Sequence, residues 1–182
     1  WECVAGDGWA MLPHTAGFID PLHSTGIAHT LCGVERLTTL LISEWNRRSM
    51  RSALQQYDRI VRTELRHVDR LVAGCYQALG HFDLLAACTM LYFAAAITYE
   101  EDRLASSAHT GTDRYFLCAD DTTLQEGISA TLYHLTDVLH SGPDERSCAY
   151  FIEETARRIA PYNTAGLFAP TINNMYAYTA TV

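Results

Sequence analysis

Lysine is missing from this sequence of 182 residues, because all 13 basic residues are arginine, against 21 acidic residues. This absence excludes a P-loop lysine, a Schiff-base lysine and any other lysine chemistry within the chain. The Gly-x-Gly-x-x-Gly fingerprint of dinucleotide-binding folds is also missing. The net charge of −8 argues against nucleic acid and membranes as partners.

Closely spaced cysteines are missing as well. The six cysteines stand at positions 3, 32, 75, 88, 118 and 148, and no pair forms a Cys-x-x-Cys. The even count allows three disulfides, but scattered reduced thiols in a cytoplasmic protein are the simpler interpretation. Glu100, Glu101 and Asp102 form an acidic run, yet no histidine lies at ligand spacing from them. We therefore predict no metal site.

A hydrophobic share of 48% with 19% charged residues is typical of a globular chain. A length of 182 residues is enough for one domain with a hydrophobic core. The chain begins with Trp1 rather than methionine, and no signal peptide is recognisable. We expect a fragment of a longer, cytoplasmic protein.

The most distinctive stretch is residues 13–28, with the sequence PHTAGFIDPLHSTGIA. Asp20-Pro21 interrupts regular structure, because the residue before a proline is pushed out of the helical region. Ser24 or Thr25 can cap a helix that begins there, and Gly26 has no Cβ to hinder a ligand. The free amides at such a helix start predict a site for a phosphate, a halide or an electron-rich ring edge. A hydrolase that pairs Ser24 with a nearby histidine lacks the expected strand–turn–helix context.

Residues 17–26, GFIDPLHSTG, resemble the second flavin-binding segment of the FAD-dependent halogenases and their relatives, with its pattern Gly-Phe-x-Asp-Pro-x-x-Ser-x-Gly beside the isoalloxazine ring. The resemblance continues more weakly through the helical remainder. It implies that the amides of Thr25 and Gly26 hold a halide. The flavin-contacting residues that it implies are Gly17, Asp20, Pro21, Ser24, Thr25, Gly26 and Ile27.

One position departs from that family. Six residues before the aspartate of the Asp-Pro pair, the wider flavoprotein pattern has a Gly-Asp whose aspartate holds the ribityl chain. Here that place is taken by His14, after Pro13. The resemblance therefore implies that His14 or a backbone group replaces the aspartate.

The same resemblance implies an enzyme as the full-length protein: a halogenase-like oxidoreductase that uses reduced FAD and oxygen on a small organic substrate, with a flavin reductase as a further partner. Its catalytic residues, including the lysine that relays hypohalous acid in halogenases, are expected upstream. The fragment alone is expected to be inactive and without bound FAD. Monooxygenases and reductases with the same loop are alternatives, as is a non-catalytic helical docking or assembly module.

Helical periodicity follows the loop and predicts helices at about 25–45, 50–79, 82–105, 123–139 and 144–159. His29 is expected to pack against a neighbouring element. The apolar seam of the second helix predicts an antiparallel neighbour, while its arginines and Asp58, Glu64 and Asp69 predict a solvated face. The first helix has one apolar side, made by Ile27, Leu31, Val34, Leu37, Leu41 and Ile42.

The third helix is expected to be the most buried, because it is apolar nearly all round from Leu84 to Ile97. This apolar run is expected to be too short to span a membrane. A short extended piece is expected at residues 115–117, and a tail after residue 161. Residues 1–12 predict two short extended pieces without partners in this chain. The predicted fold is mainly α: residues 1–48 end an FAD-binding region to whose sheet the extended pieces belong, and residues 49–182 form the helical C-terminal domain of a flavoprotein.

Overall fold

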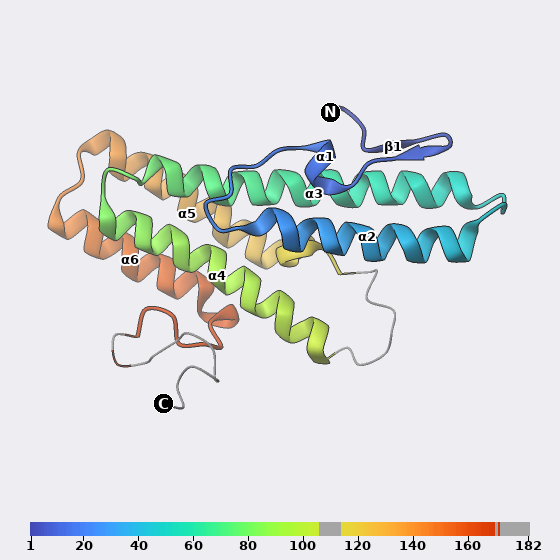
Figure 1. The fold of residues 1–182 in the computed structure, drawn as a ribbon. Coiled ribbons are helices and arrows are strands. Elements are labelled where there is room, and N and C mark those ends of the chain that lie inside the picture. The colour runs from blue at the N-terminus through green and yellow to red at the C-terminus, as the bar shows by residue number, and fades with distance from the viewer. Residues whose placement is uncertain (106–113, 170, 172–182) are drawn as a thin grey trace. The chain divides into compact units, whose positions relative to one another are not determined.

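The computed structural model describes residues 1–105, 114–169 and 171, and it is mainly α, as predicted (Figure 1). The five predicted helices are present, with ends that agree to one or two residues. The elements in chain order are β1 (Ala5–Gly6), β2 (Trp9–Ala10), α1 (Pro13–Ala16), α2 (Thr25–Glu44), α3 (Met50–Gln77), α4 (Phe82–Ala105), η1 (Phe116–Cys118), α5 (Thr122–Ser141), α6 (Glu145–Ile159) and η2 (Ala160–Tyr162).

The described residues form two compact units. The first contains Trp1–Val72 and the described part of Ser106–Asp120, and the second contains Ala73–Ala105 and the described part of Asp121–Val182. The predicted division into residues 1–48 and 49–182 concerns the flavin site rather than this packing, and it stays a prediction. The predicted tail residues from Asn173 onward lie outside the described residues.

The first unit begins with a hairpin that corrects one expectation. The two extended pieces were expected to find no partner in this chain, but β1 and β2 pair with each other in an antiparallel register, Ala5 opposite Ala10. Gly8 makes the turn with φ +77°, a backbone conformation that glycine adopts without strain. The hairpin is tied to α3, because Asp58 Oδ1 accepts a 2.6 Å hydrogen bond from the Val4 amide.

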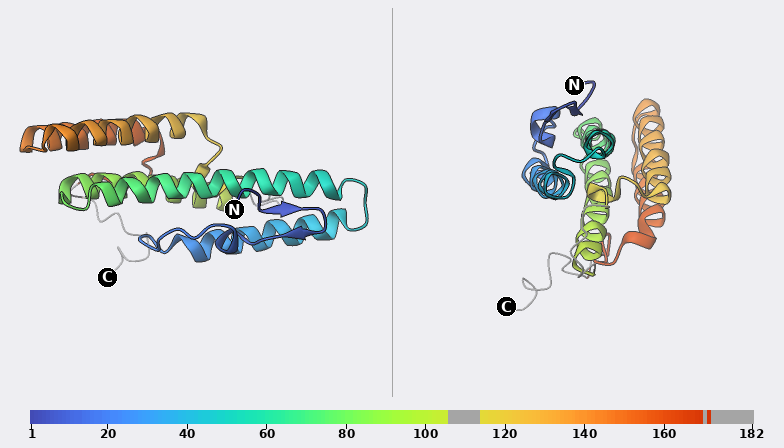
Figure 2. Two further views of the ribbon diagram at one scale, coloured as in Figure 1. Left: turned by 90° about the horizontal axis from the view of Figure 1, so that it is seen from above. Right: turned by 90° about the vertical axis from the view of Figure 1, so that its right-hand side faces the viewer.

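A short helix, α1, lies where a loop was expected. It begins at Pro13, a residue suited to the first helical turn because it has no amide hydrogen to leave unpaired. Figure 2 shows α1 lying against α2 within the first unit. The core there includes Ala16, Tyr57 and Val61. Burial raises the pKa of Tyr57 to about 12, so its hydroxyl stays protonated at neutral pH and donates to the Met11 carbonyl at 2.8 Å.

The second unit packs α6 against both α4 and α5. Leu91 and Ala95 are buried, as the prediction of a buried third helix requires, although Phe82 and Leu104 near its ends are exposed. Asp121 caps α5 through the Leu124 amide. The core of this unit consists of Cys75, Ala78, Leu84, Ala87, Cys88, Leu135, Val138 and Phe151.

By length and composition, α4 is the one helix in the described ranges that could cross a membrane, which corrects the expectation that its apolar run is too short. This is weak evidence for a membrane span, because a core helix passes the same test. In α4, 44% of the most apolar 18-residue window is buried inside the protein. The packing of the second unit therefore covers part of the apolar surface of α4. All six cysteines are free, in agreement with the interpretation as reduced thiols.

The extended piece expected at residues 115–117 is wrong. Phe116–Cys118 form a single 3₁₀ turn in which Leu117 has φ 53° and Cys118 has φ 55°. Non-glycine residues adopt this left-handed conformation only at an energetic cost, so the turn requires support from its surroundings. That support is described with the site below.

Gly33 sets how closely α1 approaches α2. A Cβ at this position would lie 2.6 Å from Pro13 Cγ, closer than real contacts allow. We expect Gly33→Ala to lower the free energy of unfolding by about 1–3 kcal/mol, the usual cost of overpacking. The measurement is urea unfolding followed by circular dichroism.

Gly127 in α5 is the matched control, because a Cβ there would make only ordinary contacts at 3.8 Å. Gly127→Ala should raise the free energy of unfolding by about 0.5–1 kcal/mol, through better helix propensity. A stabilised Gly33→Ala variant would show that α1 does not pack on α2 in this way.

Candidate functional site

The start of α2 has the geometry of an anion site. Ser24 occupies the N-cap position, as predicted, but its backbone is left-handed, with φ 53° and ψ 26°. Its side chain makes no capping hydrogen bond. A helix whose cap makes no such bond retains amide donors and a partial positive charge at its first turn. These donors can therefore serve a ligand.

A small pocket opens beside this helix start, in the first unit. Leu65 and Val68 of α3 line it. The space between the atoms is about 300 Å³, including the open mouth. The other lining residues are His14, Gly17, Ile19, Asp20, Thr25, Gly26 and His29.

Four of the seven predicted flavin-contacting residues line this pocket, namely Gly17, Asp20, Thr25 and Gly26. The other three, Pro21, Ser24 and Ile27, are exposed and do not line it. The structure thus brings the two ends of the GFIDPLHSTG segment to one place. Which of these residues contact a flavin stays a prediction.

His14 corrects the expectation that Gly26 lacks steric cover. A Cβ built on Gly26 would meet His14 Nδ1 at 3.2 Å, so the imidazole ring lies directly over this glycine. The ring also makes an edge contact with Phe18, at 5.6 Å between centroids. His14 is an exposed residue, so its ring has room to turn away when a ligand approaches.

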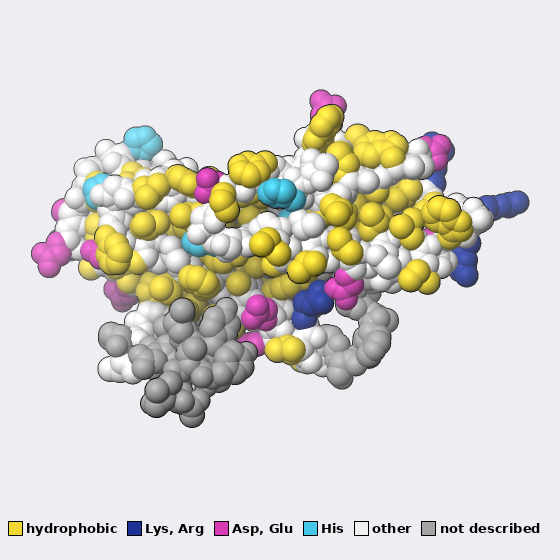
Figure 3. Space-filling model, viewed as in Figure 1, with side chains coloured by type: hydrophobic (Ala, Val, Ile, Leu, Met, Phe, Trp, Pro, Cys, Tyr) yellow, Lys and Arg dark blue, Asp and Glu magenta, His cyan; other side chains and the backbone are white. Residues whose placement is uncertain are grey.

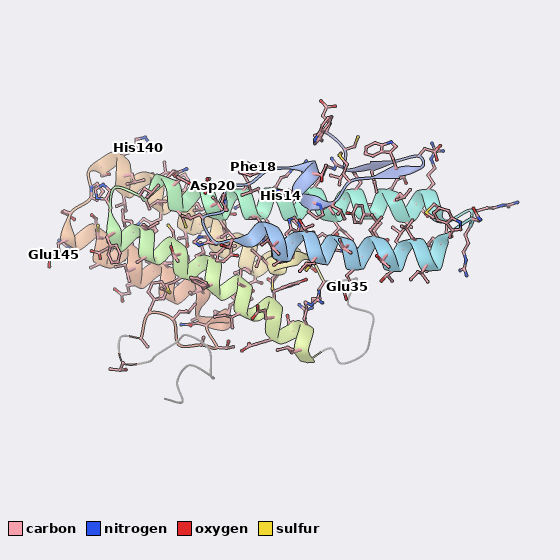
Figure 4. The ribbon with its side chains drawn as sticks, in the orientation of Figure 1. His14, Phe18, Asp20, Glu35, His140 and Glu145 are labelled. Atoms are coloured by element: carbon pink, nitrogen blue, oxygen red, sulfur yellow. The ribbon has the colours of Figure 1, made fainter. Side chains whose placement is uncertain are left out.

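The Asp20 carboxylate does not close the loop that leads into α2. Within residues 1–105, 114–169 and 171, no group donates a hydrogen bond to its carboxylate. The turn is closed instead by the backbone, where the Ser24 amide donates to the Pro21 carbonyl at 2.9 Å. Figure 4 shows Asp20 on the segment that joins α1 to α2, near His14 and Phe18. Its carboxylate is available to accept a hydrogen bond from a ligand.

Beneath the pocket, Glu64 of α3 is fully buried, with 0% exposure, and this corrects its assignment to a solvated face. Arg36 of α2 donates to both of its carboxylate oxygens, at 2.9 and 3.1 Å. His29 Nε2 donates at 3.0 Å, and the Phe116 amide donates at 2.7 Å. The sequence contained a sign that Glu64 is buried. Glu64 follows Tyr57 by seven residues and Val61 by three, so it lies on the same helix face as these two residues.

The same network supports the strained 3₁₀ turn. His67 of α3 donates a 3.0 Å hydrogen bond to the Leu117 carbonyl, and Arg36 donates one to the Arg114 carbonyl at 3.1 Å. The His29 ring stacks on Phe116 with 4.9 Å between centroids. His29 therefore packs against neighbouring elements, as predicted, and it also lines the pocket.

Burial alone would raise the pKa of Glu64. The hydrogen bond from His29, the charge of Arg36 and the Phe116 amide outweigh burial and hold that pKa below its ordinary value of 4.5. Glu64 is therefore a carboxylate at neutral pH. No group of three or more metal-ligating side chains occurs among the residues that the structure describes.

The part of the chain that contains the candidate site is similar to known proteins. Residues 9–84, which contain β2, α1, the loop, α2 and α3, match the tryptophan halogenase family. The resemblance to the FAD-dependent halogenases is confirmed. A halogenase of Pseudomonas fluorescens, the monodechloroaminopyrrolnitrin halogenase PrnC, is 32% identical over 96 residues, which make up 52% of this chain and 17% of PrnC.

Crystal structures of the halogenase PltM have the same fold. A PltM point mutant in complex with FAD matches with a TM-score of 0.70 at 20% identity, over 88% of this chain and 34% of PltM. Another PltM structure gives a TM-score of 0.69 at 19% identity, over 87% of this chain and 36% of PltM. The chain thus spans about a sixth of PrnC and about a third of PltM.

The buried network predicts a large effect of Glu64→Gln. Removing the charge leaves Arg36 buried without its counter-ion, and such a loss costs about 3–5 kcal/mol. We expect the free energy of unfolding in urea at pH 7 to fall by this amount. Glu126→Gln, at an exposed position of α5, is the matched control and should change it by less than about 0.5 kcal/mol.

The same pair of variants predicts a pH dependence. Because the folded pKa of Glu64 is depressed, its stabilisation is complete above the unfolded pKa and is lost as the pH falls through the folded pKa. The stability difference between wild type and Glu64→Gln should therefore be largest at neutral pH and should shrink below pH 4.5. A difference that stays constant into acid would show that Glu64 does not ionise inside the fold.

Proposed function

We propose that this chain forms the flavin-ring end of the cofactor site in an FAD-dependent, halogenase-like oxidoreductase. The proposal rests on the coincidence of three features at the start of α2. The halogenase family match includes this region, the helix start has no side-chain cap, and the GFIDPLHSTG segment lines a pocket beside it. Reduced flavin carries negative charge near N1 and the C2 carbonyl, and a helix N-terminus stabilises such a charge.

The residues present fit one edge of a flavin but not a whole dinucleotide. The amides at Thr25 and Gly26 offer donors, while the carboxylate of Asp20 offers an acceptor. The pocket, about 300 Å³ with its open mouth included, is too small for a whole dinucleotide. The pyrophosphate half of FAD requires the Gly-x-Gly-x-x-Gly unit that this sequence lacks. Pro21, Ser24 and Ile27 would shape the rim of the site.

When it is bound and reduced, FAD supplies the chemistry of the reaction, because reduced flavin reacts with molecular oxygen. The part of this chain is to bind and orient the ring: the α2 amides hold the anionic edge, and Leu65 with Val68 keeps water from its underside. In a halogenase the amides of Thr25 and Gly26 would also hold the halide. Because the chain has no lysine, a relay lysine and the other catalytic residues would come from elsewhere in the protein.

We further propose a small organic substrate, a flavin reductase as the source of reduced flavin, and a cytoplasmic location. Monooxygenase or reductase activity in the same superfamily is the alternative for the reaction. A non-catalytic docking module is the alternative from a different class, and the exposed apolar side of α2 favours some form of docking.

Without the pyrophosphate-binding unit, the 182-residue chain should not retain FAD. The chain, mixed with excess FAD, should separate from it on gel filtration, with a flavin absorbance far below one flavin per chain. Elution of a yellow protein at one flavin per chain would contradict this expectation.

The halide site predicts a position for bromide. In crystals of the longer, flavin-loaded protein soaked in bromide, anomalous density should lie within hydrogen-bond distance of the Thr25 and Gly26 amides. Density elsewhere only, at high bromide and with flavin bound, would favour a monooxygenase or a reductase.

In the longer, flavin-loaded protein, Gly26→Val tests the same site in solution. The added side chain displaces His14 and covers the amides, so FAD affinity should fall by at least about tenfold, or about 1.4 kcal/mol. Gly80→Val is the matched control, because a Cβ there has open space around it. Since Gly26 does not have positive φ, the unfolding temperature should change little. Unchanged FAD affinity in Gly26→Val would show that the flavin edge does not approach this amide.

A further inference from the structure

His29 is a buried residue of α2 that forms part of the pocket wall. It is 4% exposed, and it lines the pocket together with Thr25 and Gly26. Thr25 lies four residues earlier in α2, so the two residues are on the same side of the helix. His29 is not one of the residues that the family resemblance implies as flavin contacts. The proposed function therefore assigns it no role, although it adjoins the helix start.

Two contacts hold the His29 ring in one orientation. Its Nε2 atom is hydrogen-bonded to Oε2 of the buried Glu64 at 3.0 Å. One face of the ring stacks on Phe116, with 4.9 Å between the centroids and 12° between the ring planes. A side chain fixed in this way loses little further conformational entropy when a ligand binds beside it. The ring is thus preorganised as a wall of the pocket.

The hydrogen bond to Glu64 determines which nitrogen of the ring is left for a ligand. Glu64 is a carboxylate at neutral pH and can only accept, so Nε2 of His29 carries the hydrogen. Among the residues that the structure describes, none is hydrogen-bonded to Nδ1. Nδ1 accepts a hydrogen bond in the neutral ring and donates one in the protonated ring. A ligand with both kinds of group on one edge can therefore bind to it in either state.

The pocket suits the ring edge of a flavin better than a phosphate group. Among the described residues no arginine lines it, and the carboxylate of Asp20 would repel a phosphate. Figure 3 shows hydrophobic side chains gathered over α2 and the hairpin, a surface that suits an aromatic ring. The pyrimidine edge of a flavin offers carbonyl oxygens and one N–H group. These groups match the amide donors of Thr25 and Gly26 and the Nδ1 atom of His29.

We propose that His29 binds the pyrimidine edge of the flavin through Nδ1, and that Glu64 and Phe116 act through His29 as positioning residues. This inference rests on the proposed function. The α2 amides and the imidazole then contact neighbouring groups of the same edge, and the buried carboxylate sets the orientation of the imidazole. The strained turn at Phe116 serves the site as well, because it carries the ring on which His29 stacks.

Replacing His29 by glutamine in the longer, flavin-loaded protein tests the proposal. The amide nitrogen of glutamine can still donate to Glu64, whereas Nδ1 and the aromatic ring are lost. The FAD affinity of His29→Gln should fall at least about tenfold, as measured by fluorescence titration of the apoprotein.

His67→Gln is the matched control. His67 is also buried and donates through Nε2, to the Leu117 carbonyl, but it does not line the pocket. Its replacement by glutamine should leave the FAD affinity unchanged. An equal loss of affinity in both variants would show that the network acts on the fold rather than on the flavin, and it would overturn the inference.

Two further outcomes separate failure of this inference from failure of the proposed function. Unchanged FAD affinity in His29→Gln, in a protein that binds FAD as wild type, overturns the inference alone. A longer wild-type protein that binds no FAD contradicts the proposed function, and this inference with it.

The midpoint potential of the bound flavin gives a readout that a purely structural role of Glu64 would not move. Glu64→Gln removes one negative charge beneath the pocket and leaves the charge of Arg36. The reduced, anionic flavin should then be favoured over the oxidised form about tenfold, which corresponds to a rise in potential of about 30 mV. An unchanged potential would overturn the positioning role of Glu64.

Phe116→Leu tests the other positioning residue without a change in charge, and it serves also if Glu64→Gln does not fold. It keeps the backbone amide that donates to Glu64 and removes the ring that stacks on His29. FAD affinity should fall at least about threefold in the otherwise wild-type protein. In a His29→Gln background the same change should cause no further loss, because Phe116 acts through His29. Additive losses would overturn its positioning role.

Discussion

The arrangement of the first unit depends on one buried carboxylate. Glu64 has no contact with solvent, and isolated burial of such a charge is prohibitively costly. Four donor groups from His29, Arg36 and the Phe116 amide compensate for the lost hydration. Two of these residues belong to α2, so the carboxylate fixes the rotation of α2 about its axis. That rotation directs the buried side toward α3 and leaves the apolar side exposed.

The pocket follows from this constraint. His29 lines it from one side because Glu64 and Phe116 hold the imidazole in place. The start of α2 lies one turn earlier, so the amides of Thr25 and Gly26 are positioned by the same contact. A site for an anionic ring edge can thus be assembled on a rigid helix pair, although the loop that leads into it is closed only by a backbone turn. Such support from regular elements suits precise positioning.

Local patterns in the sequence predicted much of the fold. Apolar periodicity located α2 to α6, with ends that agree to one or two residues. The GFIDPLHSTG segment located the candidate site, because its spacing is specific to a family. Contacts distant in sequence could not be predicted in the same way. Glu64 was assigned to solvent because acidic residues are rarely buried, and only its donors, 28 to 52 residues away, reverse that preference. The His14 ring over Gly26 likewise depends on α1, whose four residues carry too little periodicity to predict.

The Phe116–Glu64 contact also bears on the order of events during synthesis. The two residues are 52 positions apart, and the whole of α4, which belongs to the other unit, lies between them in the chain. The ribosome must therefore release α4 and the segment after it before the last donor can reach the buried carboxylate. Until then, α2 and α3 carry a partly compensated charge between them, and the first unit is incomplete although its N-terminal residues emerged first. Completion of the N-terminal unit is thus coupled to the appearance of residues from the middle of the chain.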